Sequence, residues 1–344
     1  MSNLKNIAVG IDLGTTYSAI AYVDEFGQPK IIPNDTNDRI TPSVVFFESP
    51  TSIIVGKEAK NVLHYEPEKV VSFVKREMGN RKEEVRSEEN YGEPKPYDFY
   101  GHVYSPEEIS ALILKKLKQD AENYFGGQEV KDAVITVPAY FSEAQRNATR
   151  TAGEMAGFNV LQIINEPTAA AYSYGLDQKL DKTQKVFVFD LGGGTFDVTV
   201  LQIDVNGDEK NLRVISTDGD HKLGGKDWDQ KIIDYACNIY LNEHGFDPKD
   251  DILAYGALIE SAEIAKISLS KKDKAKVVIK PSDGASMPIE ITRETFNEIC
   301  RDLIERVSNL CTNVLSQSGD LSWKDIDRII LAGGSTRMPM IIDF

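Results

Sequence analysis

The fold is decided by two stretches of similar sequence, IAVGIDLGTTYSAIAYV (Ile7 to Val23) and VFVFDLGGGTFDVTVLQI (Val186 to Ile203). Each runs from an apolar strand through Asp-Leu-Gly and a turn of small residues with threonine into a second apolar strand. Roughly half of the 344-residue chain separates Asp12 from the matching Asp190. A duplication on that scale predicts two lobes of similar fold.

The first stretch predicts a β-hairpin over residues 7–23, because two apolar runs flank a glycine-containing turn. The boundary between the lobes is expected between Gly175 and Lys185, where the sequence LDQKLDKTQ is polar and aperiodic. The expected ranges are residues 1–180 for lobe I, with an upper subdomain at about 40–110, and 181–344 for lobe II, with one at about 225–300.

Strand-like and helix-like segments alternate along the rest of the chain, which favours α/β layers. Ser105 and Ser142 each begin a capping box, predicting helices that end near Phe125 and Gly157. Four further helices are predicted from the apolar pattern and its breaks: Pro167 to Tyr174, ended by Gly175, then Lys226 to Glu243, Asp251 to Ser268 and Arg293 to Ser316. Strands are predicted at Val44 to Phe47, Ala133 to Val137, Val160 to Ile164, Val186 to Phe189, Val198 to Ile203, Val277 to Lys280 and Arg328 to Leu331.

Composition and charge exclude several classes of protein. Hydrophobic residues make up 41% and charged residues 27%, so the chain is neither disordered nor fibrous. Aspartate and glutamate total 54 against 39 for lysine and arginine, and the net charge of -15 would repel nucleic acid and anionic membranes. A phosphate ligand would therefore depend on local donors such as backbone amides or a bridging cation.

The three cysteines, Cys237, Cys300 and Cys311, have no CxxC spacing and indicate reduced thiols. The N-terminus has no signal-peptide core, and no apolar run reaches the roughly 20 residues of a membrane span. The four histidines lack the spacing of metal ligands. We therefore expect a soluble, cytoplasmic protein.

The repeated turns suit phosphate chemistry. A strand that ends in aspartate and enters a glycine-threonine turn gathers backbone N–H groups and hydroxyls beside a carboxylate. Such a carboxylate fits a hydrated Mg²⁺, which keeps most of its waters. Two of these turns facing each other across a cleft would hold a nucleotide's phosphates for phosphoryl transfer.

A single turn of this kind is more often an ordinary hairpin. A third glycine-rich turn, LAGGSTR at Leu331 to Arg337, makes nucleotide binding the better interpretation. Neither the GxxxxGK[ST] nor the GxGxxG phosphate-binding pattern is present.

At these turns the sequence resembles the nucleotide-binding domain of the seventy-kilodalton heat-shock chaperones of the DnaK type, members of the actin and sugar-kinase superfamily. Six strings carry the resemblance: GIDLGTTYS at 10–18, VPAYF at 137–141, INEPTAAA at 164–171, FDLGGGTFDV at 189–198, LGGKDWD at 223–229 and LAGGSTRMP at 331–339. The resemblance implies an α/β, two-lobed actin-like ATPase fold, in which a ribonuclease-H-like mixed sheet with flanking helices is duplicated and each lobe has an upper subdomain.

The resemblance also implies roles for residues around the phosphates. Asp12 and Asp190 would hold Mg²⁺ through water, and Glu166 and Asp197 would complete the acidic lining and order the attacking water. Lys75, which alone would be interpreted as a surface lysine, would contact the γ-phosphate. The turns would bind β- and γ-phosphates through Gly14, Thr15, Thr16, Tyr17, Gly192, Gly193, Gly194 and Thr195.

For the nucleoside, the resemblance implies contacts from one helix face and two further glycine pairs. Glu263, Lys266 and Ser270 follow helical spacing, although alone they would form an ordinary charged face. The complete set is Gly224, Gly225, Glu263, Lys266, Ser270, Gly333, Gly334, Ser335 and Arg337.

Such a domain would bind and slowly hydrolyse ATP, with Mg²⁺ and ATP or ADP as cofactors. Its partners would be a J-domain co-chaperone and a nucleotide exchange factor, with no nucleic acid and no membrane, and we expect a monomer. Because the chain stops at Phe344, we expect it to lack the family's peptide-binding domain, so client peptides would bind only through that absent domain. An actin-like filament protein and a small-molecule kinase of the same fold remain alternatives.

Overall fold

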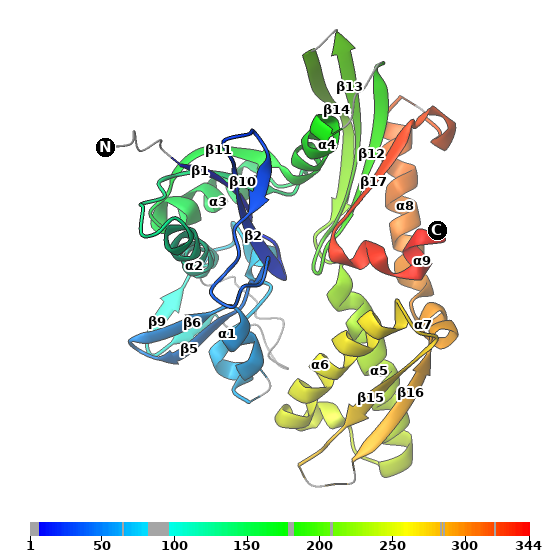
Figure 1. The fold of residues 1–344 in the computed structure, drawn as a ribbon. Helices are drawn as coiled ribbons and strands as arrows, with labels where there is room; N and C mark the ends of the chain where they lie inside the picture. The colour runs from blue at the N-terminus through cyan, green and yellow to red at the C-terminus, as the bar shows by residue number, and fades with distance from the viewer. Residues whose placement is uncertain are drawn as a thin grey trace. The chain divides into compact units, whose positions relative to one another are not determined.

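A computed structural model describes residues 7–63, 65–81, 96–177, 182–206, 209–282, 284, 286–319 and 321–344. The chain divides into two compact units (Figure 1). Unit 1 comprises Met1–Val62 and Glu68–Asp177, and unit 2 comprises Leu63–Pro67 and Gln178–Phe344. Each unit has its own sheet and its own apolar core.

The main sheet of unit 1 is built on the predicted hairpin, formed by β1 (Ala8–Asp12) and β2 (Tyr17–Val23). Buried and exposed residues alternate along β1, as expected for a strand with one face on the core. β1 pairs antiparallel with β2 and parallel with β10 (Asp132–Val137), which pairs parallel with β11 (Asn159–Asn165). The strand order is β11-β10-β1-β2-β3, with β4 also paired to β2.

Smaller sheets and helices complete unit 1. α2 (Pro106–Tyr124) packs on β2, and α3 (Glu143–Met155) packs on β10 and β11 (Figure 1). The other elements described in this unit are β3 (Pro29–Ile31), β4 (Thr41–Pro42), β5 (Val45–Ser49), β6 (Ser52–Val55), β7 (Val70–Val71), β8 (Tyr97–Phe99), β9 (His102–Tyr104), α1 (Lys57–Val62) and α4 (Glu166–Asp177).

Both predicted capping boxes are confirmed. The Glu108 amide donates to Ser105 Oγ (3.2 Å) and the Ser105 amide to Glu108 Oε2 (2.7 Å). Ser142 and Gln145 make the same reciprocal pair at the start of α3. These caps satisfy backbone donors that a helix start would leave unpaired, so the capping residues define where both helices begin.

Unit 2 repeats the strand pairing of unit 1. β12 (Gln184–Leu191) pairs antiparallel with β13 (Phe196–Asn206) and parallel with β17 (Arg328–Ala332), just as β1 pairs with β2 and β10. β14 (Glu209–Asp220) extends the sheet beside β13, in the order β14-β13-β12-β17. The predicted duplicated mixed sheet is confirmed.

Helices and a second small sheet cover this framework. α8 packs on β13 and β14, and α6 packs on β15 and α5. The elements described are α5 (Gly225–His244), α6 (Ile252–Leu269), α7 (Arg293–Ile299), α8 (Arg301–Gln317), α9 (Pro339–Ile342), β15 (Lys274–Ile279) and β16 (Met287–Thr292). Short 3₁₀ helices along the chain are η1 (Pro67–Lys69), η2 (Val74–Glu77), η3 (Pro248–Asp250), η4 (Trp323–Asp325) and η5 (Gly334–Arg337).

Two predicted helices were wrong in detail. α4 continues through Gly175 to Asp177, because glycine inside a helix costs only about 1 kcal/mol and does not by itself end it. The helix predicted from Arg293 to Ser316 is interrupted at the fully buried Cys300. The interruption lets α7 pack on β16 and α5, while α8 follows β13 and β14, which one straight helix would not reach.

The described helices include none that is both long enough and apolar enough to cross a lipid bilayer. The upper subdomains expected at about 40–110 and 225–300 remain predictions, although β5 to β9 fall within the first range and β15 and β16 within the second.

Replacing Asp251 by alanine should destabilise unit 2. The Asp251 carboxylate is the N-cap of α6, where it accepts from the amides of Leu253 and Ala254, and it also accepts from the Ser282 amide (2.6 Å). The expected loss is about 1 kcal/mol, seen as a melting temperature lower by roughly 3 °C in a thermal scan at pH 7.

The same change should matter less in acid. Donation by the Ser282 and Ala254 amides holds the pKa of Asp251 below its ordinary value. Its stabilising effect is therefore complete above the unfolded-state pKa of about 4 and is lost as the pH falls through the folded-state pKa. Asp250→Ala, which removes the same charge at an exposed position, is the control. Equal melting temperatures for the two variants at pH 7 would contradict the capping role.

Candidate functional site

The first of the repeated turns lies at the carboxyl end of β1 in unit 1. Asp12 ends β1 with an exposed side chain, and its Oδ1 accepts a hydrogen bond from Thr136 Oγ1 on β10 (3.3 Å). The chain turns so tightly that a Cβ on Gly14 would collide with the carbonyl oxygen of Tyr17. Only glycine allows this close approach of the backbone.

Two hydroxyls in this turn are buried without a hydrogen-bond partner: Thr15 Oγ1 and Thr16 Oγ1. Leaving a buried hydroxyl unpaired costs about 1–3 kcal/mol, so such groups in a folded protein call for an explanation. A ligand with acceptor oxygens, such as a phosphate, would satisfy both. In unit 1, these two unpaired hydroxyls therefore indicate a ligand-binding site.

Lys75 and Glu166 form a buried ion pair in the same unit. Lys75 Nζ lies 2.6 Å from Glu166 Oε1, and the two side chains are 6% and 12% exposed. Lys75 comes from η2, and Glu166 is the first residue of α4. Burial of a lysine ammonium requires such a partner, so Lys75 is no ordinary surface lysine.

The second turn joins β12 to β13 in unit 2. Asp190 and Asp197 lie directly opposite each other in the antiparallel register, and Asp197 is 1% exposed. Two carboxylates in that position repel each other, which favours a nearby cation. Thr195 is also buried, and its carbonyl accepts from the Gly192 amide (3.0 Å).

Two other predicted segments of unit 2 pack against this second turn. The amides of Gly225 and Lys226 donate to the carbonyls of Gly192 (3.0 Å) and Gly193 (2.8 Å). Ser335 Oγ donates to the same Gly192 carbonyl (2.9 Å). The glycine turns at 192–194 and 224–225 therefore meet, and the third turn joins them through Ser335.

Lys266 supports this assembly from α6. Its Nζ donates to the Gly225 carbonyl (2.9 Å) and to Asp229 Oδ2 (2.7 Å). Glu263 and Ser270 are half-buried on the same helix, and Ser270 Oγ donates to the Lys266 carbonyl at the long distance of 3.4 Å. Gly333, Gly334 and Arg337 are exposed.

Sequence reasoning missed three residues that contact predicted site residues within their own unit. Thr136 reaches Asp12 through the parallel register of β1 and β10, and Asp229 pairs with Lys266. Lys60 on α1 donates to Tyr17 Oη (2.9 Å) and lies 5.1 Å from the centre of its ring. Asp229 lies inside the string LGGKDWD, which pointed to the right segment, whereas nothing in the sequence pairs position 60 with position 17.

The donor set fits a hydrated magnesium ion better than a directly bound metal. Among the residues that the structure describes, no three or more His, Cys, Asp or Glu side chains gather to hold a metal. Mg²⁺ needs only one or two carboxylates because it retains water, and in unit 1 Asp12 ends β1 with an exposed carboxylate beside the Thr136 hydroxyl.

The cysteines do not add a nucleophile. All three are free and buried. Burial raises the pKa of Cys237 and of Cys311 to about 12 and raises the pKa of Cys300 as well. They are therefore protonated at neutral pH and serve as apolar core side chains.

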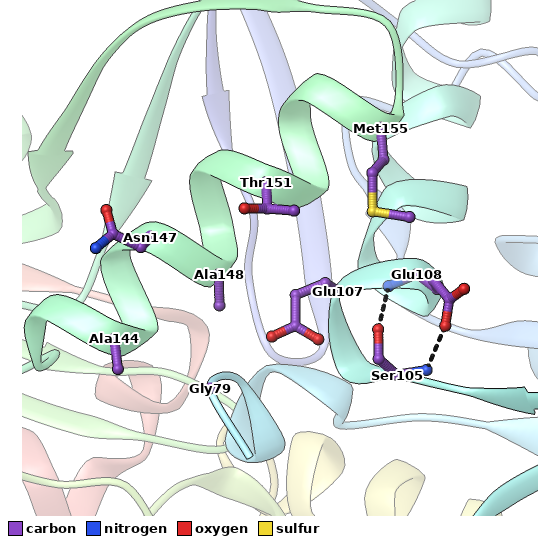
Figure 2. A pocket seen from close by; sticks show the side chains of 9 residues that line it. All are labelled: Gly79, Ser105, Glu107, Glu108, Ala144, Asn147, Ala148, Thr151 and Met155. Carbon is purple, nitrogen blue, oxygen red and sulfur yellow. Dashed lines mark hydrogen bonds between the residues drawn. The ribbon is translucent and has the colours of Figure 1, made fainter. Parts of the chain in front are cut away.

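An open hollow of about 460 Å³ lies between the start of α2 and α3 in unit 1 (Figure 2). Ser105 and Glu108 on its rim bond to each other in the capping box. Its lining contains none of the predicted site residues: Gly79, Ser105, Glu107, Glu108, Ala144, Asn147, Ala148, Thr151 and Met155. The hollow is separate from the turns that carry the candidate chemistry.

Comparison with known proteins agrees with the fold. The family model described as Hsp70 protein matches residues 8–344. The chain belongs to the Hsp70 family. This membership accords with the actin-like ATPase fold, to which the two mixed sheets with flanking helices correspond.

Curated relatives in the Hsp70 family carry the name Chaperone protein DnaK. Those of Thermotoga neapolitana and Thermosipho melanesiensis are 47% and 46% identical over all of this chain and 55% of their own length. That of Halobacterium salinarum is 47% identical over 97% of this chain and 50% of its own length. The chain thus spans about half the length of these relatives.

Gly333→Ala should disturb the second turn strongly. Gly333 has φ = 82°, and a Cβ there would collide with the Leu191 carbonyl and lie 2.7 Å from Asp190 Oδ1. We expect a loss of more than about 1 kcal/mol and a clearly lower melting temperature. Gly334→Ala is the matched control, because a Cβ on Gly334 meets nothing within 4 Å. A Gly333→Ala protein as stable as Gly334→Ala would refute the tight packing on Asp190.

Proposed function

We propose that this chain is the ATP-binding and ATP-hydrolysing domain of a DnaK-type molecular chaperone. Membership of the Hsp70 family supports the proposal at the level of the whole fold. The single observation that carries it is the pair of buried hydroxyls, Thr15 Oγ1 and Thr16 Oγ1, which lack partners beside the Asp12 carboxylate.

In this proposal the carboxylates divide into two roles. Asp12 and Asp190 would hold Mg²⁺ through its water ligands, and the ion would supply positive charge against the diphosphate leaving group. Glu166 and Asp197 orient the attacking water and accept its hydrogen bonds. The phosphate oxygens are bound by the turn residues Gly14, Thr15, Thr16, Tyr17, Gly192, Gly193, Gly194 and Thr195.

Lys75 contacts the γ-phosphate. The buried pair with Glu166 supports this role, because the lysine places a cation and the glutamate a water acceptor 2.6 Å apart. Low solvent exposure strengthens the electrostatic effect of the ammonium on developing negative charge. Hydrolysis then depends on Lys75 more than nucleotide binding does.

The proposed nucleoside contacts come from the start of α5, from α6 and from the third turn. Ser335 and Lys266 bond to the glycine turns, so they support the pocket as well as line it. The full proposed set is Gly224, Gly225, Glu263, Lys266, Ser270, Gly333, Gly334, Ser335 and Arg337.

At the level of the whole chaperone, the nucleotide state would rotate the lobes and so control client binding by a further domain. We propose a J-domain co-chaperone and a nucleotide exchange factor as partners and a monomeric state. Free, buried cysteines support a reducing compartment such as the cytoplasm.

Lys75→Ala tests the catalytic role. We expect ATP hydrolysis in single-turnover assays to fall by about a hundredfold, the usual effect of removing a group that stabilises transition-state charge. Calorimetric affinity for ATP with Mg²⁺ should change by less than about threefold, because the turns still bind the phosphates.

Lys118→Ala is the matched control, since Lys118 is also largely buried in unit 1 and paired with Glu122 (3.3 Å). Its hydrolysis rate should equal that of the wild type. Equal losses of binding and hydrolysis in Lys75→Ala would contradict the assigned role, and a wild-type chain that ignores ADP and Mg²⁺ would refute the proposed function.

A further inference from the structure

Ser43 makes three hydrogen bonds to the first turn and its hairpin. It directly follows β4, the two-residue strand that pairs with the start of β2. Its amide donates to the Thr16 carbonyl (2.9 Å), and its Oγ donates to the Gly14 carbonyl (2.7 Å). Its Oγ also lies 2.9 Å from Ser18 Oγ on β2.

The direction of these bonds follows from the donor inventory. A serine hydroxyl has one proton, and Ser43 uses it for the Gly14 carbonyl. The bond between the two hydroxyls must therefore run from Ser18 to Ser43. A relay of two hydrogen bonds therefore runs from Ser18 to Ser43 and on to the Gly14 carbonyl. Both serines are almost fully buried, at 1% and 2% exposure.

Fixing these two carbonyls also fixes two amides. In a planar trans peptide the C=O and the following N–H point in opposite directions. Ser43 holds the Gly14 and Thr16 carbonyls toward itself, so the Thr15 and Tyr17 amides point away from it. Backbone N–H groups presented on one side of a turn can bind an anion.

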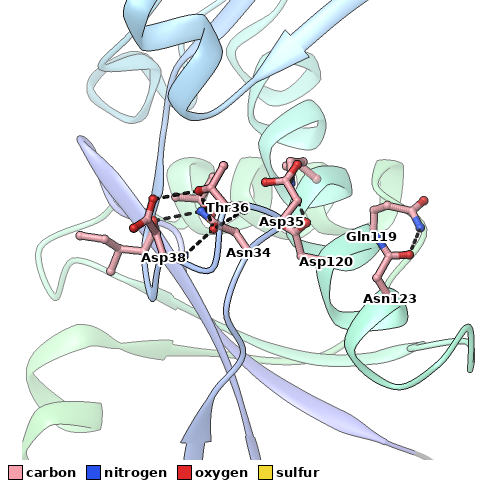
Figure 3. Close-up of polar contacts among 10 residues, drawn as sticks. Asn34, Asp35, Thr36, Asp38, Gln119, Asp120 and Asn123 are labelled. Atoms are coloured by element: carbon pink, nitrogen blue, oxygen red, sulfur yellow. Dashed lines mark hydrogen bonds and ion pairs between the residues drawn. The ribbon is translucent and has the colours of Figure 1, made fainter.

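Side-chain hydrogen bonds join residues within the segment that leads into β4 (Figure 3). Asn34 Oδ1 accepts from the amides of Thr36 and Asp38, and Asn34 Nδ2 lies 3.3 Å from Thr41 Oγ1. Lys116 on α2 bridges Asp35 (3.1 Å) and the buried Asp120 (2.6 Å). Ser43 is thus presented by a segment that is tied to α2 of unit 1.

We propose that Ser43 is a positioning residue that aims the amides of the first turn at the phosphates of the bound nucleotide. The proposal rests on the proposed function, since it requires that this turn bind phosphate. Ser43 acts only through the turn backbone, and Ser18 assists by fixing the orientation of the Ser43 hydroxyl.

The test is calorimetric titration of the full chain with two ligands, ADP in the presence of Mg²⁺ and adenosine, which has no phosphate. For Ser43→Ala we expect ADP affinity to fall about tenfold, in proportion to one or two lost hydrogen bonds. Adenosine affinity should stay within about twofold of wild type, because the amides of this turn contact only phosphate. A purely structural role would weaken both ligands alike.

Two further variants sharpen the result. Ser18→Ala keeps the bond from Ser43 to Gly14, so its loss of ADP affinity should be smaller, and the double variant should be no weaker than Ser43→Ala alone. Thr149→Ala is the matched control, because Thr149 is equally buried in α3 and its hydroxyl also donates to a backbone carbonyl (2.9 Å). It should bind ADP as the wild type does.

Unchanged ADP affinity in Ser43→Ala, or equal losses of ADP and adenosine, would overturn the positioning role while leaving the proposed function intact. A wild-type chain that binds adenosine but not ADP with Mg²⁺ would overturn both. Additive losses in the double variant would overturn the relay from Ser18.

Discussion

The rest of the structure depends on hydrogen bonding along both edges of one strand in each sheet. Each of these strands carries an aspartate at or next to its last residue. β1 lies between β10 and β2, and β12 lies between β17 and β13, so the backbone at Asp12 and Asp190 cannot shift without breaking a ladder. The chain must then reverse within a few residues. Each turn is consequently held in one conformation, and its donors are oriented before any ligand arrives.

Electrostatics explains why such a turn needs support from other segments. The second turn places Asp197 in a buried position of a protein whose net charge is already -15. The Lys75 ammonium beside Glu166 and the Lys266 ammonium beside Asp229 supply local positive charge within each unit. Breaking a buried pair of this kind costs about 3–5 kcal/mol, because one charge is left without its partner. The ion pairs therefore hold the acidic groups in place rather than add much net stability.

The two units support their repeated turns with different segments of the chain. In unit 1, Ser43 binds the carbonyls of the turn through a short strand beside β2. In unit 2, the start of α5 and Ser335 bind the carbonyls of Gly192 and Gly193 instead. In each case carbonyls face the supporting segment, and the amides that follow them face the other way. The duplicated sheets share the hairpin, but the carbonyls that are held are those of Gly14 and Thr16 in unit 1 and of the adjacent Gly192 and Gly193 in unit 2, so each turn has its own support.

The sequence by itself determined the repeated hairpins, both capping boxes and the candidate turn residues, because each depends on neighbours within a few positions of the chain. It could not place the break at Cys300 or the continuation of α4 through Gly175, since these depend on which sheets the helices cover.

Only the tertiary structure decided that Lys75 is buried against Glu166, that Lys266 bonds to the Gly225 carbonyl and that Ser43 reaches Gly14. These contacts join residues 29 to 91 positions apart. No local pattern encodes such a distance, because it is set by strand register and by helix packing, to which residues all along the chain contribute.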